Sequence, residues 1–166
     1  MATCPSCNAE SPAGVRWCGI CHGNLIERSI GRLASPGKRL GAYILDLVIP
    51  LTALLLIMVV GGAGAAAGGR DAGGPIGFVL GFGLMIAYVI WAFKLFAQGA
   101  TPGKRLLGMR VVKEGGQTAG FWTMLGREWI GKWISAMVFS LGFLWILFDR
   151  DRQGWHDKLV STYVVE

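Results

Sequence analysis

The 166-residue chain has few charged residues. Only 16% of its residues are Asp, Glu, Lys or Arg, whereas 53% are hydrophobic; an ordinary soluble domain has about 25% charged residues. The chain has no Gly-X-Y period, which excludes a collagen-like fold although it holds 26 glycines. Disorder is excluded as well, because disordered chains are poor in the aliphatic and aromatic residues that are abundant here. Since the apolar residues fall into long runs, the composition indicates a protein that contacts lipid.

Cysteine is absent after position 21, and the four cysteines form two Cys-x-x-Cys pairs. A secreted disulfide scaffold would be richer in cysteine and would follow an apolar signal segment, whereas residues 1–11 are polar. Two residues between cysteines allow a tight turn to present both sulfurs to one ion, and two such turns complete the tetrahedral shell that Zn²⁺ favours. We therefore expect a structural zinc ribbon over residues 1–26, with an iron–sulfur centre or a redox dithiol as alternatives. The ligands would be Cys4, Cys7, Cys18 and Cys21.

The residues around these cysteines limit what the ribbon can bind. His22 follows a set that is already complete, so we expect it to be a bystander rather than a ligand. Residues 1–25 contain only Arg16 against Glu10, which leaves no basic surface for nucleic acid. Contact with a cytoplasmic protein is the expected role of the ribbon.

Two apolar segments, residues 40–60 and 74–96, are each long enough to cross a bilayer core of about 30 Å. Between them, the glycine-rich residues 61–69 are expected to form a connection with little structure of its own. Small residues recur every fourth position around the start of the second segment, where they would let a neighbouring helix approach closely. They are Gly73, Gly77 and Gly81.

A third apolar segment, residues 129–148, is too short in its uncharged part to be a clear span, so it either spans or re-enters. Residues 1–39 and 98–128 each hold five Lys or Arg against two acids. By the positive-inside rule both regions face the cytoplasm. We expect the membrane to be a bacterial inner membrane. Residues 111–112 and 162–165 are expected to be short strands, and their pairing would require one side of the membrane. We therefore favour re-entry.

The predicted architecture is that of an all-α integral membrane protein. A small helical bundle, with two clear spans and a third spanning or re-entrant apolar helix, occupies residues 35–166. The zinc ribbon precedes it, and residues 27–34 form a linker. We expect the lipid bilayer to be the main partner.

One short motif occurs twice, as Ser35 to Gly41 and as Thr101 to Gly108. In each copy a hydroxyl residue suits the N-cap of a helix and the following proline suits its first position. A glycine and then two basic residues follow, and the basic residues are expected to meet lipid phosphate at the cytoplasmic surface. This prediction concerns Lys38, Lys104 and Arg105.

Asp46 is the one acidic residue inside the first span, and it lies seven positions, or two helical turns, after Arg39. An ionised Asp in a span costs about 2.5–3.5 kcal/mol unless it pairs, faces a cavity or takes up a proton. It is therefore a candidate functional residue. The plainer alternative is that Asp46 lies near the interface and fixes helix packing.

Three stretches together resemble the RDD family of small bacterial membrane proteins, which is named for one Arg and two Asp. They are Lys38 to Asp46, Thr101 to Val112, and Asp149 to Thr162. The resemblance implies that Arg39, Asp46 and Asp157 are the naming residues and that Arg127 is a further recurrent arginine. It also implies a role in the transport of small solutes or ions.

Two hypotheses follow for the function. In the first, Asp46 pairs with Arg39 or Arg127, with Asp157 nearby, and binds or relays a proton or cation. Because so few spans cannot enclose a pathway, this protein would need to form a homo-oligomer or bind a partner subunit. In the second, the Arg/Asp set only fixes the fold, and the ribbon of a non-transporting adaptor docks a cytoplasmic partner. We expect no enzyme, because neither His22 nor His156 adjoins a recognisable nucleophile.

Overall fold

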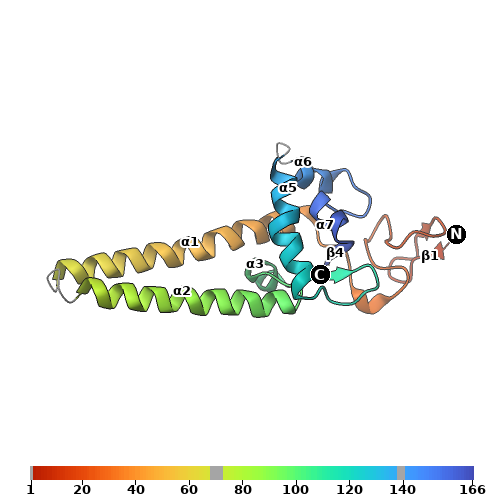
Figure 1. Ribbon diagram of the computed structural model, residues 1–166. Helices are drawn as coiled ribbons and strands as arrows, with labels where there is room; N and C mark the ends of the chain where they lie inside the picture. The colour runs from red at the N-terminus through yellow and green to blue at the C-terminus, as the bar shows by residue number, and fades with distance from the viewer. Residues whose placement is uncertain (1, 68–72, 138–140) are drawn as a thin grey trace.

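The fold has a long two-helix arm and a base into which both ends of the chain are folded (Figure 1). It was obtained as a computed structural model that describes residues 2–67, 73–137 and 141–166. The arm consists of α1 (Pro36–Ala67) and α2 (Gly73–Ala97), which run antiparallel. All other elements lie at the base, so the molecule has two regions of unlike character.

Both arm helices are long and apolar enough to cross a membrane. Their apolar side chains are exposed around the helices, as expected of spans that face lipid. The first helix is longer than the predicted segment at both ends and continues through Gly61 to Ala67. The expectation of an unstructured connection over residues 61–69 is therefore wrong for 61–67, while 68–69 lie outside the described residues.

The two arm helices approach closely at Gly81. A Cβ atom built at this position would lie 2.2 Å from Cγ2 of Ile57, so any side chain larger than hydrogen would push the helices apart. This observation agrees with the predicted small-residue face at that position. The side chains around Gly73 and Gly77 lie outside the described part of the chain.

A short helix and a strand follow the arm. The helix α3 (Pro102–Leu106) packs against α1, and β3 (Arg110–Lys113) comes directly after it. This strand pairs antiparallel with β4 (Thr162–Val165), with Val111 opposite Val164. The predicted pairing is confirmed, and it brings the end of the chain to the side of the arm where α2 ends.

The third apolar segment is broken into pieces. It begins with α4 (Phe121–Leu125), continues through η2 (Gly126–Gly131) with π-helical geometry, and runs on in α5 (Lys132–Met137). The pieces after residues 138–140 are α6 (Leu141–Leu144) and η3 (Trp145–Leu147). The helix axes before and after this break differ by 108°. A bend of this size fits either a broken span or a re-entrant segment.

In Figure 1 the α4–α5 helix crosses the base of the arm rather than lying along it. Its outer face is rich in tryptophan, and Trp122, Trp129 and Trp133 are each at least 65% exposed. Tryptophan is enriched at membrane–water interfaces, so this face suits the headgroup region of a bilayer. The chain then returns through α7 (Trp155–Leu159) to β4.

The N-terminal ribbon packs on the base. It contains β1 (Ala2–Thr3) paired with β2 (Glu10–Ser11), and η1 (Arg28–Ile30) follows. The Trp17 and Tyr163 rings lie 5.3 Å apart, which joins the ribbon to β4. These rings belong to a buried cluster that also contains Ile30, Leu33, Val112 and Val165.

The linker between ribbon and arm joins the same sheet. The Ala34 amide donates to the Val164 carbonyl at 2.9 Å, and Leu33 forms a bridge with Val165. A second buried cluster lies between the sheet and the helices and is formed by Ala34, Ala42, Phe96, Met109, Val111, Ala119, Met124 and Val164. The base thus has a core, which includes residues from the base ends of both arm helices.

Candidate functional site

The four cysteines of the ribbon form a candidate metal centre. Their sulfur atoms all lie within 4.8 Å of one another. The Sγ atoms of Cys4 and Cys21 are 3.5 Å apart, and those of Cys7 and Cys18 are 3.6 Å apart. A tetrahedral Zn²⁺ with Zn–S bonds of about 2.3 Å would hold its sulfurs about 3.8 Å apart. The donor set and its spacing therefore fit a four-coordinate metal ion.

Both cysteine pairs sit in turns of the same form. The amide of Asn8 donates to the Cys4 carbonyl at 2.9 Å, and the amide of His22 donates to the Cys18 carbonyl at 3.1 Å. Asn8 and His22 have φ angles of 57° and 56°, in the left-handed region that closes such turns. The two halves of the ribbon thus present their sulfurs through equivalent backbone turns.

The His22 ring points to another partner. Its Nε2 lies 2.6 Å from Nη2 of Arg152, which can only donate, so Nε2 is the acceptor. Burial and the charge of Arg152 both lower the pKa of His22. This contact occupies Nε2, and the group of side chains that could hold a metal ion consists of the four cysteines.

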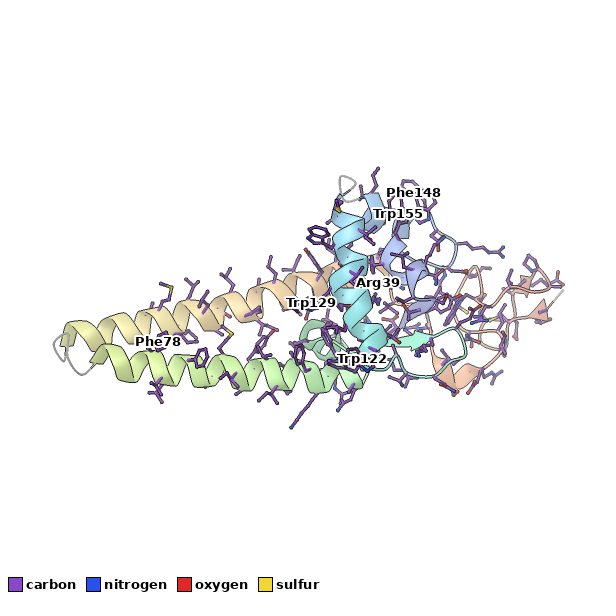
Figure 2. The ribbon with its side chains drawn as sticks, in the orientation of Figure 1. Arg39, Phe78, Trp122, Trp129, Phe148 and Trp155 are labelled. Atoms are coloured by element: carbon purple, nitrogen blue, oxygen red, sulfur yellow. The ribbon has the colours of Figure 1, made fainter. Side chains whose placement is uncertain are left out.

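A second polar centre lies at the base of the arm, around the Asp157 carboxylate in α7. Asp157 has no exposed surface, and two arginines from distant parts of the chain pair with it. Arg39 Nη1 donates to Oδ2 at 3.0 Å, and Arg127 Nε donates to Oδ1 at 2.6 Å. Figure 2 shows Arg39 at the end of α1 that enters the base.

The energetics of this centre follow from its burial. Burial alone would raise the pKa of Asp157, but the positive charges of Arg127 and Arg39 and the hydrogen bond from Arg127 reverse the effect and lower it to about 2. The carboxylate is therefore ionised at neutral pH. Arg39 also donates through Nη2 to the Val164 carbonyl in β4 at 3.2 Å. One carboxylate thus ties together α1, the broken helix, α7 and the sheet.

Local helix geometry supports the position of Arg127. It lies in η2, the π-helical turn between α4 and α5. Such turns widen a helix locally and are frequent at functional sites. Gly131 in the same turn lets α7 approach, since a Cβ atom there would lie 2.9 Å from Cβ of His156.

Glu128 is a buried residue that sequence reasoning missed. It accepts from Lys104 Nζ at 2.7 Å and from Arg127 Nη1 at 2.6 Å, and it also pairs with Lys132. The signal available in the sequence is a lone acid beside Arg127, with Lys132 one helical turn later. Burial lowers the pKa of Lys104 to about 8, against the opposing charge of Glu128.

Asp46 lies apart from the arginines. Its carboxylate accepts from the Thr101 hydroxyl at 2.6 Å and from the Gly103 amide at 2.7 Å, so it binds the start of α3. The described residues give it no ion pair within 4.0 Å. The predicted pairing of Asp46 with Arg39 or Arg127 is therefore wrong, and Asp157 takes that place.

The basic residues of the repeated motif differ in environment. Lys38 is exposed and pairs with Glu166, and Arg105 is exposed. Lys104 is buried against Glu128, which removes it from the expected contact with lipid phosphate. Ser35 and Thr101 cap their helices as predicted, because each hydroxyl accepts from the amide three residues on at 3.3 Å.

A cavity of about 580 Å³ joins these groups. Four basic side chains and Asp46 contribute to its wall, together with His156, whose pKa burial lowers to about 4. The basic residues are Arg39, Lys104, Arg127 and Lys132. Apolar side chains from α1, α6 and η3 also line the cavity. The site can hold a small molecule near a positive surface at the base of the arm.

The model of the RDD family matches residues 33–161, which is most of the chain. The chain belongs to the RDD family. Its ribbon precedes the matched region, which contains the arm, the broken helix, β3 and α7, while β4 follows it. Two helices of this RDD protein are apolar enough to span a membrane, so it is a membrane protein of that family.

Bacterial relatives share this region. The protein YckC of Bacillus subtilis is 30% identical over 130 residues, which are 76% of this chain and 80% of YckC. The proline-rich antigen of Mycobacterium leprae is 29% identical over 92 residues, or 54% of this chain and 36% of that protein. A proline-rich antigen homolog of Mycobacterium tuberculosis is 34% identical over 83 residues, with 48% and 34% covered. This chain thus spans about a third of the two mycobacterial antigens. No solved structure matches it.

Proposed function

We propose that this RDD protein is a non-enzymatic, multi-pass protein of the bacterial inner membrane that takes part in the transport of small solutes or ions. The observation that carries the proposal is the cavity at the base of the arm, where ionisable side chains meet the end of the first span. Ionisable groups at membrane depth are costly and commonly mark ion or solute pathways.

The proposed orientation places the base and the ribbon in the cytoplasm. Basic residues concentrate before the first helix and after the second, as the positive-inside rule requires of cytoplasmic segments. Reduced thiolates suit the same compartment. The paired strands β3 and β4 add support, since they tie the end of the chain to the segment that follows α2.

Transport requires more than one copy or a partner subunit. Two spans cannot enclose a pathway, and the apolar side chains of the arm, such as Phe78 at 70% exposure, face outward. We propose a homo-oligomer in which arms from neighbouring copies enclose the path above the cavity. Asp46 would then be the group of the first span that a proton or cation meets, held in place by Thr101 and Gly103.

Flux in proteoliposomes tests this proposal. We expect wild-type protein to move ions or protons above the rate of empty vesicles and Asp46→Asn to lose most of that flux. The matched control is Asp151→Asn, which makes the same change outside the cavity in a residue without an ion pair among those described. Wild-type vesicles no faster than empty ones, or equal flux in both variants, would contradict the proposal.

We propose Zn²⁺ as the ion of the ribbon, in a structural role. Four thiolates fill a tetrahedral shell and leave no position for a reacting water. Metal analysis of the purified protein should find one zinc per chain, and Cys18→Ser should abolish it. Because Trp17 of the ribbon packs on Tyr163, loss of the metal should also expose the ribbon to protease. Iron in place of zinc would contradict this assignment.

A second candidate function is a non-transporting adaptor whose ribbon docks a cytoplasmic protein. The observation in its favour is that the ribbon keeps two isoleucines on its surface, Ile20 at 73% and Ile26 at 75% exposure, while its other face packs on the base. We expect the double change of these residues to Glu to abolish capture of that protein, and we expect wild-type vesicles to move ions no faster than empty ones. Unchanged capture by the variant, or flux by the wild type, would exclude the adaptor.

A further inference from the structure

The cavity at the base has two unlike walls. One wall carries basic side chains, including Arg39 from α1 and Lys132 from α5. The other is apolar and includes Leu40, Leu144 and Leu147. These three leucines are about half exposed or more, so the apolar wall opens toward the outer, membrane-facing surface of α1. A bound molecule would need a head for one wall and an apolar tail for the other.

Arg39 supplies charge to the basic wall. The side chain of Arg39 is only 8% exposed, and its Nη1 and Nη2 atoms are bound to Asp157 and Val164. Its Nε has no accessible surface. A ligand in the cavity would therefore meet the charge of Arg39 and not a free donor.

Lys132 provides the contact for an oxyanion in the cavity. It pairs with Glu128, but that carboxylate already accepts from Lys104 and Arg127. The Lys132 side chain is 20% exposed, and its Nζ lies 5.2 Å from the centre of the Tyr43 ring at the cavity wall. The ammonium can therefore turn to a second anion and leave Glu128 neutralised by its other partners.

The charges that line the cavity determine the sign of the charge that the head of the ligand must carry. Four basic side chains line the cavity against one acid, Asp46, and His156 is neutral at pH 7. Even with Asp157 and Glu128 behind the wall, positive groups outnumber negative ones by one. A free inorganic anion would leave the apolar wall without a partner.

We propose that this cavity binds an anionic amphiphile, a molecule with an oxyanion head and an acyl chain. The head oxygens accept from Lys132 beside the positive charge of Arg39, and the chain lies against Leu40, Leu144 and Leu147. The bilayer that surrounds the arm supplies molecules of this class. The proposal goes beyond transport, since it requires binding and no movement across the membrane.

Lipid binding by the full-length, zinc-loaded protein in a neutral detergent tests the proposal. The probes are phosphatidylglycerol and phosphatidylcholine with identical oleoyl chains, and native mass spectrometry counts the bound molecules. We expect phosphatidylglycerol to bind about tenfold more tightly, because its head carries a net charge for the basic wall. Equal affinities for the two lipids would overturn the proposal.

Paired variants locate the site. Lys132→Gln removes a partly exposed cavity charge and leaves Lys104 and Arg127 on Glu128, so the protein should fold. We expect it to weaken phosphatidylglycerol binding about tenfold. The control Arg105→Gln removes an exposed charge that is not part of the cavity and should change binding less than about twofold. Equal effects of the two variants would place the lipid elsewhere and overturn the proposal.

Two further probes separate the sources of the oxyanion. Oleate shares the acyl chain and should compete with phosphatidylglycerol in a manner that depends on Lys132. Inorganic phosphate lacks the chain and should not compete at the same concentration. Leu144→Asn changes the apolar wall alone and should weaken both amphiphiles several-fold. Competition by phosphate as strong as that by oleate would mean that the cavity binds anions without an acyl chain. This result would overturn the proposal.

Discussion

The arm and the base of this RDD protein differ in where they place their apolar side chains. Along the arm, large apolar side chains point outward, and Phe78 lies on α2 far from the base (Figure 2). In the base, apolar side chains such as Val111 and Val164 are fully buried, and charged ones such as Arg127 and Asp157 are buried with them. The arm is therefore built for lipid around it, whereas the base is built as a water-soluble domain is.

This difference shows where specificity resides. The arm helices are held to each other by shape, through small residues and a close approach at Gly81. The base is held by a hydrophobic core and by buried ion pairs that join segments far apart in sequence. Removing one partner of a buried ion pair leaves an uncompensated charge, so substitutions in the base should have larger effects than equally conservative ones in the arm.

The largest effect is expected from Asp157→Asn. It leaves the Arg39 and Arg127 guanidinium groups buried without their shared carboxylate, which should lower the free energy of unfolding by about 3–5 kcal/mol. Thermal unfolding in detergent measures the loss, and the arm should stay helical by circular dichroism after the base has melted. The same change at the partly exposed Asp151 is the control. A melting temperature equal to that of the control would show that the network does not hold the base.

A pH effect of intermediate size is expected from His156. Burial lowers its pKa from 6.5 to about 4, so it stays neutral in the folded base but takes up a proton in the unfolded chain below pH 6.5. Stability from this group is complete above pH 6.5 and is lost as the pH falls to about 4, by about 3 kcal/mol. His156→Gln should flatten the wild-type decline in melting temperature across this window. An equally steep decline in the variant would assign the effect to another group.

The smallest effect concerns the arm. Gly81→Ala places a methyl group 2.2 Å from Ile57 Cγ2 and should cost about 1–3 kcal/mol, because a β-branched neighbour yields poorly. Gly83→Ala is the matched control, since nothing lies within 4 Å of a Cβ atom there. The two variants should differ in arm stability while the metal content of the ribbon stays the same. Equal stability of the two variants would mean that α1 and α2 are not in contact at Gly81.

Much of the backbone was predictable from the sequence because its signals are local. Apolar run lengths indicate the arm, and hydroxyl–proline pairs mark the starts of α1 and α3, where Ser35 and Thr101 cap their helices. The cysteine spacing indicates the metal centre in the same way. Each of these features depends on residues within a few positions of one another.

The polar centre was less predictable because its partners are remote. Arg39 pairs with Asp157, which lies 118 positions later in the sequence, and no periodicity predicts that contact. The two copies of the repeated motif bury different positions. The second basic residue, Arg39, is buried in the first copy, and the first basic residue, Lys104, is buried in the second. The copies differ because one begins a long helix and the other a five-residue helix. Asp46 lies on the face of α1 that meets α3, so it binds a helix start instead of an arginine.

The side of the membrane on which the chain ends tests the central claim most directly. The account holds that the third segment turns back and that β4 pairs with β3, which places Glu166 on the same side as Gly115 in the turn after β3. Reporter pairs at these two positions, one fluorescent only in the cytoplasm and one active only outside, measure this. We predict cytoplasmic signals from both positions. Opposite sides would contradict the account, because a chain that crosses a third time cannot form this base.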